Sequence, residues 1–406
     1  MTPKDYEGSL KFVSGTTDGR GDGCAPACPP QHSFEMRCGA VENTDSAVAE
    51  FDGWLRELME SQGSDLHVKV GSAPMIRLPD GLQRMERDPI TPVETSAIAE
   101  SIIPADRREM FDKNGEVDFA YSLKEVGRFR ANVFKQRGSI SMVLRRLRFG
   151  GPTFEEMGLP DSVQQLADEH RGLILVTGPT GSGKTTTLAA MIGYINETKP
   201  VHIVTIEDPI EVLHRDAMAS INQREIGNDT QDFLSALRAA LRQDPDVILI
   251  GEMRDTETVR AAIQAAETGH LVLSTLHTVD ATETVNRVID FFPPYQQKQV
   301  RLALAGTLRG IICQRLVATV DGGRTPALEI LVNTGRVAER IVDPERTSEI
   351  KEVLTDGQFY GMMTFDQSLL VLLQEGKITT EAAFQAVSSR HDFELAMQQA
   401  GLALPV

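Results

Sequence analysis

The fold of this chain is decided by one stretch of sequence, Gly178-Pro179-Thr180-Gly181-Ser182-Gly183-Lys184-Thr185. It matches the G-x-x-x-x-G-K-[ST] phosphate-binding loop, directly after a predicted strand and directly before a predicted helix. Its glycines let successive backbone N–H groups face a phosphate, and the helix N-terminus adds partial positive charge. In this motif the lysine reaches the β- and γ-phosphates and the threonine hydroxyl binds Mg²⁺. The predicted nucleotide-binding residues are Gly178, Pro179, Thr180, Gly181, Ser182, Gly183, Lys184, Thr185 and Thr186, with Thr185 also as a Mg²⁺ ligand.

The sequence around the loop predicts a parallel sheet with helices on both faces. Short apolar runs alternate with segments of helical periodicity, which is typical of strands buried on both faces. The predicted strands are residues 173–177, 202–206, 247–250 and 271–275. Beyond Pro294 the pattern is mainly helical, with one hairpin signal at Asp321-Gly322-Gly323.

Polar side chains follow three of these strands. Glu207 and Asp208 follow one strand, Glu252 follows the next, and His277 follows residues 271–275. Open parallel sheets bind ligands beyond the carboxyl ends of their strands, so these side chains are expected to face the loop, position water and hold the metal. His277 is a candidate sensor of the γ-phosphate, because an imidazole N–H can bond a terminal phosphate oxygen. Acidic residues after strands are also common helix caps, and a histidine at a strand end is often only packed or solvated.

A smaller α/β domain is predicted before the loop domain. Its strand candidates are residues 66–70, 75–78, 117–122, 128–134 and 141–147, with a hairpin turn at Asp80-Gly81. Thr91-Pro92-Val93-Glu94 combines an N-cap, a first-turn proline and a capping-box glutamate, which predicts a helix start. Order is expected to begin behind a cap at Ser46, and Gly150-Gly151-Pro152 is expected to be a linker.

Composition limits the possible partners. The 406 residues hold 41 Lys and Arg against 58 Asp and Glu, a formal net charge of −17, which disfavours nucleic acid and anionic lipid surfaces as bulk partners. No apolar run reaches the roughly 18 residues of a membrane helix, and no signal peptide is recognised, so a cytoplasmic location is expected. The four cysteines, Cys24, Cys28, Cys38 and Cys313, form no disulfide framework and match no common zinc pattern.

These segments, in this order, resemble the type II/IV secretion ATPase superfamily and, within it, the PilT/PilU type IV pilus retraction ATPases. The resemblance covers residues 64–401. It rests on the phosphate loop, an aspartate box at Glu207-Asp208, the segment Gly251-Glu252-Met253-Arg254-Asp255 and a histidine box at residues 268–277. It also includes Ile221-Asn222-Gln223-Arg224-Glu225.

The resemblance implies a PAS-like N-terminal α/β domain, a RecA-like P-loop NTPase domain and a helical C-terminal segment. It implies a Mg²⁺-dependent ATPase that binds ATP at the domain junction and powers pilus retraction, and so twitching motility, as a homohexamer. Of Glu207 and Glu252, one aligns water and the other supports Mg²⁺; Glu252 is the candidate metal ligand, but the base stays unassigned. Arg130 and Arg145 are implied arginine fingers; their alternative is to be strand-surface arginines in ordinary ion pairs.

The predicted organisation is a disordered tail (1–45), the PAS-like domain (46–149), a linker and helix (150–171), the RecA-like domain (172–334) and the helical segment (335–406). The implied partners are an inner-membrane platform protein and a related retraction ATPase, without nucleic acid or membrane insertion, so the implied location is the inner face of the cytoplasmic membrane. The chain departs from the family in its Cys-bearing N-terminal extension and at residues 335–342, a poor match to the retraction motif. Other segments leave it between the PilT and PilU branches.

Three other functions are weighed against retraction. Pilus assembly and type II secretion ATPases usually carry a four-cysteine zinc module after the catalytic strands, whereas here Cys313 is the only cysteine after Cys38. A nucleic-acid translocase could use the same loop in a ring, but the acidic composition argues against it. A nucleotide-gated scaffold that does not hydrolyse is disfavoured because both Glu207 and Glu252 are retained.

Overall fold

The computed structural model describes residues 35–387 and 389–402, with side chains from residue 46 onward. Residues 1–34 of the predicted tail lie outside the described residues. The predicted disorder is wrong for residues 35–45, because they belong to helix α1 (Glu35–Glu60), and Ser46 lies inside that helix instead of capping it. Extending an existing helix adds a hydrogen bond per residue without the cost of a new nucleus, and no proline interrupts this stretch.

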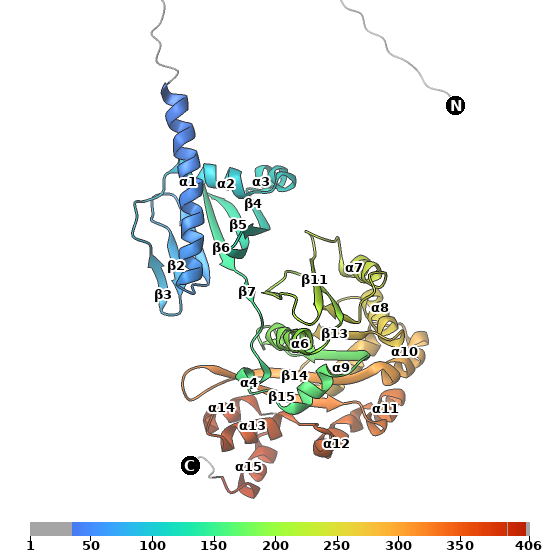
Figure 1. Cartoon of the computed structure of the whole chain (residues 1–406). Helices are drawn as coiled ribbons and strands as arrows, with labels where there is room; N and C mark the ends of the chain where they lie inside the picture. Colours follow the sequence, from blue (N-terminus) through green and yellow to red (C-terminus); the bar gives the residue numbers. More distant parts are fainter. Residues whose placement is uncertain (1–34, 388, 403–406) are drawn as a thin grey trace, which may run out of the picture.

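The N-terminal lobe is a six-stranded antiparallel sheet with helices packed on it (Figure 1). The strand order is β3-β2-β1-β6-β5-β4. The strands are β1 (Asp65–Lys69), β2 (Met75–Leu78), β3 (Gly81–Arg84), β4 (Glu116–Leu123), β5 (Gly127–Gln136) and β6 (Ser139–Arg146). The helices are α1, α2 (Pro92–Ile102), the 3₁₀ turn η1 (Ala105–Arg107) and α3 (Arg108–Asn114). Phe51, Leu55 and Leu58 of α1 are fully buried against the strands, which explains their helical spacing.

Two local predictions in this lobe are confirmed. The predicted hairpin joins β2 and β3, with its turn one residue earlier than predicted: Pro79 and Asp80 form the turn, and Gly81 begins β3 opposite Leu78. Helix α2 begins with the predicted capping box, in which Thr91 accepts from the backbone N–H of Glu94 and Glu94 accepts from the backbone N–H of Thr91. Both features arise from residues close together in sequence, so neighbouring residues suffice to predict them.

The second lobe, which carries the phosphate loop and is called the P-loop lobe, is built on a seven-stranded sheet of order β11-β9-β12-β13-β8-β14-β15. All adjacent strands are parallel except the β14–β15 pair, the predicted hairpin. The strands are β8 (Gly172–Thr177), β9 (His202–Glu207), β11 (Ser220–Glu225), β12 (Val247–Ile250), β13 (Leu271–Leu276), β14 (Leu308–Ala318) and β15 (Arg324–Val332). The α/β class and the four apolar strands are confirmed, whereas β11 and the extension of the sheet by β14 are not in the prediction.

Both faces of this sheet are covered. Along β8, Leu173 and Leu175 pack into one apolar core and Ile174 and Val176 into the other, so every residue of the strand is buried. One face carries α4 (Phe154–Met157), α5 (Asp161–Ala167) and α6 (Lys184–Thr198). The other face carries α7 (Phe233–Ala240), α8 (Thr256–Glu267), α9 (Ala281–Asp290) and α10 (Pro294–Thr307).

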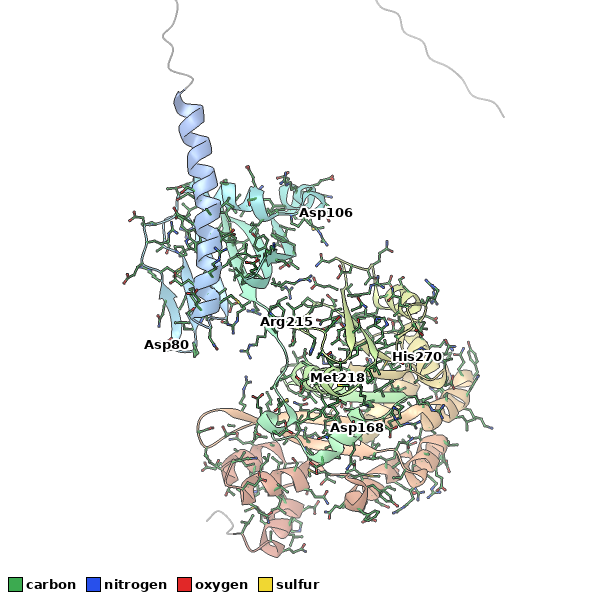
Figure 2. The ribbon with its side chains drawn as sticks, in the orientation of Figure 1. Asp80, Asp106, Asp168, Arg215, Met218 and His270 are labelled. Atoms are coloured by element: carbon green, nitrogen blue, oxygen red, sulfur yellow. The ribbon has the colours of Figure 1, made fainter. Side chains whose placement is uncertain are left out.

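The linker between the lobes is attached to the P-loop lobe. Strand β7 (Arg148–Phe149) pairs with β10 (Val212–Leu213), and the N–H of Gly150 donates to the Leu213 carbonyl at 2.8 Å. Arg215, labelled between the lobes in Figure 2, places its guanidinium 4.8 Å from the Phe149 ring centre. A Cβ on Gly151 would lie 2.8 Å from the Ala189 backbone in α6, so only glycine fits there. The predicted Gly150-Gly151 linker is therefore packed rather than free.

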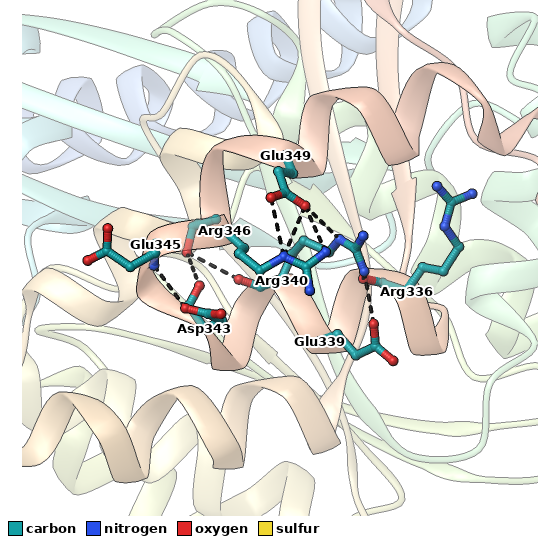
Figure 3. A network of polar contacts seen from close by, with 8 residues as sticks. Arg336, Glu339, Arg340, Asp343, Glu345, Arg346 and Glu349 are labelled. Carbon is teal, nitrogen blue, oxygen red and sulfur yellow. Dashed lines mark hydrogen bonds and ion pairs between the residues drawn. The ribbon is translucent and has the colours of Figure 1, made fainter.

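The C-terminal segment is helical, as predicted. It comprises α11 (Gly335–Val342), η2 (Pro344–Glu349), α12 (Ile350–Thr355), η3 (Gly357–Tyr360), α13 (Phe365–Gln374), α14 (Thr380–Ala386) and α15 (Arg390–Gln399). Helix α11 is the segment that matches the retraction motif poorly. Glu349 accepts from Arg346 at 2.9 Å and lies 3.3 Å from Arg340 of α11, so ion pairs tie α11 to η2 (Figure 3).

Candidate nucleotide site

A cavity of ≈ 470 Å³ lies where the phosphate loop meets the carboxyl ends of the parallel strands. It brings together three segments that are far apart in sequence: the loop, the aspartate box and the histidine box. The predicted residues that line it are Thr180, Gly181, Gly183, Lys184, Thr185, Thr186, Glu207, Asp208, Glu252 and His277. Gly178, Pro179 and Ser182 belong to the same loop but do not line the cavity.

The loop conformation requires its glycines. Gly178 and Gly183 have φ values of 143° and 92°, which disfavour any residue with a Cβ. Both also lie against Gln314 of β14: a Cβ on Gly178 would overlap the Gln314 carbonyl, and one on Gly183 would lie 2.7 Å from its side-chain nitrogen. The buried Gln314 side chain accepts from Thr187 of α6 at 2.8 Å. Gln314 of strand β14 therefore packs directly against the phosphate loop.

Lys184 folds back over the loop that carries it. Its Nζ donates to the carbonyls of Gly178 at 2.9 Å and Pro179 at 3.1 Å. An ammonium group has three N–H donors, so one is left for a phosphate oxygen. Burial lowers the pKa of Lys184, and the negative charge of Glu252 opposes that shift.

Glu207 ends strand β9 and is buried, with 8% exposure. Its Oε1 accepts from Thr205 Oγ1 at 2.6 Å and from Gln223 Nε2 at 3.1 Å. Burial raises the pKa of Glu207, and these two hydrogen bonds lower it in part. The side chain is thus a desolvated carboxyl whose orientation is set by neighbours on β9 and β11.

Glu252 lies two residues beyond strand β12, which runs between β9 and β13 in the sheet. Arg254 Nη2 lies 2.8 Å from its Oε2, and His277 Nε2 lies 3.0 Å from its Oε1. The contact with Glu252 raises the pKa of Arg254. Because strands β12 and β13 run in parallel, the end of each strand delivers one member of the Glu252–His277 pair.

The structure does not bring the two predicted arginine fingers to this cavity. Arg130 of β5 and Arg145 of β6 are directly paired across the N-terminal sheet, and neither lines the cavity. Arg145 Nε lies 2.8 Å from Asp65 Oδ1, and Arg130 Nε lies 3.9 Å from Asp118. In this arrangement both arginines form ordinary ion pairs on the surface of the strands, which was the alternative prediction for them.

Several residues of the cavity are missed by the sequence prediction. Arg254 lines the cavity and lies in the segment 251–255. Its positive charge two residues after Glu252 could have indicated that it belongs to the site. Arg324 and His214 also line it. Arg324 begins β15, and only the pairing of β15 with β14 and of β14 with β8 carries it to the loop. No local pattern around Arg324 indicates that position.

The residues present fit a magnesium ion. Mg²⁺ takes oxygen ligands and usually keeps several waters beside one or two protein groups and the phosphates. The Thr185 hydroxyl and the Glu252 carboxylate line the same cavity and supply oxygens of this kind. No group of three or more metal-ligating His, Cys, Asp and Glu residues occurs within the described ranges, and Cys313, the free cysteine there, is buried.

A buried carboxyl lies next to the strand that leads into the loop. Glu329 of β15 is paired with Cys313 of β14, which in turn is paired with Thr177 at the end of β8. Glu329 accepts from the N–H of Ala281, the first residue of α9, at 2.8 Å. Burial raises the pKa of Glu329 to about 7. Asp280 raises it as well, whereas Arg315 and Lys351 oppose the shift.

The raised pKa predicts a pH-dependent stability. A carboxyl whose folded pKa lies above its unfolded value of 4.5 contributes most below that value, and the contribution is lost as pH rises toward about 7. Glu329→Gln removes the charge and keeps an acceptor for Ala281. We expect the free energy of unfolding of Glu329→Gln, compared with wild type at the same pH, to be higher at pH 8 than at pH 5 by about 2 kcal/mol. The variant is therefore relatively more stable at pH 8. Denaturant unfolding at the two pH values measures this difference.

The matched control is Glu352→Gln on α12, the same substitution at an exposed glutamate. An equal effect of Glu329→Gln at pH 5 and pH 8 would show that the carboxyl does not titrate in this range.

Fold and site together define a P-loop ATPase with an added N-terminal α/β lobe. Residues 44–391 match the family described as type II/IV secretion system protein. The type IV pilus retraction ATPase PilT of Pseudomonas aeruginosa is 42% identical over 330 residues, covering 81% of this chain and 96% of that protein. The type IV pilus ATPase PilU of the same organism is 42% identical over 347 residues, covering 85% and 91%. The chain belongs to the type II/IV secretion ATPase family, among its PilT/PilU members.

A solved structure agrees. The crystal structure of the pilus retraction motor PilT with bound ADP superimposes with a TM-score of 0.77 at 45% identity, covering 85% of this chain and 98% of that one. The likeness therefore spans both lobes. Between residues 35 and 402, with residue 388 left aside, no helix is both long enough and apolar enough to cross a bilayer.

Proposed function

We propose that this chain is the ATP-hydrolysing motor of type IV pilus retraction, and so of twitching motility. The observation that carries the proposal is the meeting of Lys184, Glu207, Glu252 and His277 in one cavity of a chain similar to PilT over most of its length. A phosphate loop alone serves many nucleotide-binding proteins. The added carboxylates and histidine are what hydrolysis and its coupling to movement require.

In the proposed reaction, Lys184 and the loop N–H groups hold the phosphates, and Mg²⁺ is held by Thr185 and Glu252. Mg²⁺ supplies charge neutralisation at the β- and γ-phosphates when bound. Glu207 and Glu252 share the positioning of water and the support of the metal. His277, now 3.0 Å from Glu252, exchanges that contact for a γ-phosphate oxygen and so senses the presence of ATP.

The proposed assembly is a homohexamer in which the N-terminal lobe moves relative to the P-loop lobe as ATP binds and is hydrolysed. Arg130 and Arg145 stay predictions as arginine fingers, since closure or a neighbouring subunit has to bring them to the nucleotide. The proposed partners are an inner-membrane platform protein and a related retraction ATPase, which places the ring at the inner face of the cytoplasmic membrane. The equal identity to PilT and PilU supports neither branch over the other.

The rival function, pilus assembly or type II secretion, has less support. Its usual four-cysteine zinc module has no counterpart, because Cys313 is the single cysteine after Cys38. Cys313 is also buried in the sheet, where it pairs with Thr177 and Glu329.

Deletion of the gene tests the proposal. We expect cells to keep surface pili and lose retraction, and the wild-type gene in trans to restore it, because an extension motor makes pili and a retraction motor removes them. Pili are counted by electron microscopy and retraction is followed by twitching and by labelled-pilus imaging. Loss of surface pili in the deletion strain would instead identify an extension motor.

A further inference from the structure

The segment Ile221-Asn222-Gln223-Arg224-Glu225 has no role in the proposed reaction, yet it forms strand β11 beside the catalytic edge of the sheet. Strand β11 pairs in parallel with β9, with Gln223 opposite Thr205 and Glu225 opposite Glu207. Gln223 therefore lies two pairs before the strand end that carries Glu207.

The Gln223 side chain makes three hydrogen bonds to two separate segments. Its Nε2 donates to Glu207 Oε1 at 3.1 Å and to the Val212 carbonyl at 2.8 Å. Its Oε1 accepts from the backbone N–H of His214 at 2.8 Å. Both N–H donors are used, and flipping the amide would turn its oxygen toward a carboxylate and a carbonyl. The amide orientation is therefore fixed by its partners.

The second segment held by Gln223 is the one to which the interdomain linker attaches. Val212 and Leu213 form β10, which pairs with Arg148 and Phe149 of β7. Leu147, the residue just before β7, packs with Ile210 and Leu213 in a small apolar cluster. One amide side chain thus lies between the linker attachment and the Glu207 carboxylate.

We infer that Gln223 is a positioning residue that couples the interdomain linker to Glu207. A displacement of the linker moves β10, β10 carries the Gln223 amide with it, and the amide changes the placement of the Glu207 carboxylate. Lobe movement and hydrolysis are coupled through three hydrogen bonds. This inference rests on the proposed ATPase function.

The hydrogen bond from Gln223 also favours the ionised form of Glu207. Burial raises the pKa of Glu207, and the bonds from Thr205 and Gln223 work against that rise. Two further carboxylates that raise the pKa, Glu211 and Glu225, face it from the neighbouring loop and from β11. Other titratable groups line the cavity on its remaining sides: Lys184, Asp208, His214, Glu252, Arg254 and His277.

The first test is Gln223→Met, which keeps the length of the side chain and removes all three hydrogen bonds. We expect kcat for ATP to fall about 10–100-fold, the size of one lost hydrogen bond to a charged group. The Kd of a fluorescent ATP analogue should change by less than about 3-fold, since Gln223 does not line the cavity. Asn222→Ala, an exposed change on the same strand, is the control and should keep wild-type kcat.

The second test is a double-mutant cycle with Leu147→Ala, which loosens the linker attachment. We expect Leu147→Ala to lower kcat in the wild-type background and to have little further effect in the Gln223→Met background. Losses in kcat that multiply in the Leu147→Ala, Gln223→Met double variant would overturn the coupling. In the Asn222→Ala background, Leu147→Ala should lower kcat as much as it does in wild type. Wild-type kcat in either Leu147→Ala or Gln223→Met would overturn it as well.

Hydrogen–deuterium exchange separates this inference from the proposed function. Gln223→Met removes the acceptor of the His214 N–H, so exchange in the peptide around residues 210–216 should rise, whether or not the chain hydrolyses ATP. Unchanged exchange there would show that the Gln223 side chain does not hold residues 212–214, which refutes the inference. Raised exchange in the variant, in a protein whose wild type hydrolyses no ATP, refutes the proposed motor function and leaves the Gln223 hydrogen bonds in place.

Discussion

Lys184→Ala is expected to remove ATP hydrolysis, with a fall of at least about 10²–10³-fold and a large loss of nucleotide affinity. The lysine supplies the positive charge at the β- and γ-phosphates, and charge-stabilising groups of this kind contribute several kcal/mol to transition-state binding. Its two bonds to the carbonyls of Gly178 and Pro179 also hold the loop in shape. Phosphate release and binding of a fluorescent ATP analogue measure the two effects.

Lys199→Ala is the matched control for this substitution. Lys199 lies at the other end of the same helix, where it donates to the Ala167 carbonyl at 2.8 Å and does not line the cavity. It should keep wild-type binding and hydrolysis. Substantial hydrolysis by Lys184→Ala, with a folded chain shown by thermal unfolding, would contradict the assignment of the phosphate site.

Glu252→Gln is expected to leave ATP binding within about 3-fold of wild type and to lower kcat by about 10²–10³-fold. The amide keeps the size of the side chain and can still accept from Arg254, but it carries no charge for the metal and takes up no proton from water. Steady-state hydrolysis at several Mg²⁺ concentrations, together with a binding titration, separates the two quantities.

Comparison with Glu207→Gln identifies which carboxylate acts on the water. If Glu252 supports the metal, its variant needs more Mg²⁺ for half-maximal activity, while the Glu207 variant does not. Glu257→Gln on α8 is the control, because that exposed glutamate pairs with Arg260 at 3.9 Å and does not line the cavity. Wild-type hydrolysis by Glu252→Gln would remove this residue from the catalytic set.

Much of the fold follows from local sequence. The phosphate loop, the apolar strands 173–177 and 247–250 and the capping box at Thr91 each depend on residues close together in the chain. The family resemblance added the lobes and their order. The helical start of α1 was missed, because residues 35–45 lack the apolar periodicity that marks the rest of that helix.

Part of the candidate site could be predicted from local sequence as well. Lys184, Glu207, Glu252 and His277 follow strands of one parallel sheet, and such strands end at one edge, so their meeting could be inferred from the strand pattern. Arg324 and Gln223 could not be inferred in this way. They reach the site and its surroundings through the strand pairs β14–β15 and β9–β11, whose register depends on contacts across the sheet.

Local sequence indicates phosphate binding, because the phosphate loop is a short continuous segment of glycines followed by one lysine. How Glu207 is held and where the linker is attached are set by tertiary contacts instead. Those depend on the Gln223 amide, on the β7–β10 pair and on the packing of Gly151 against α6, all of which join residues far apart in the chain. Such contacts form only once the sheet has fixed its register.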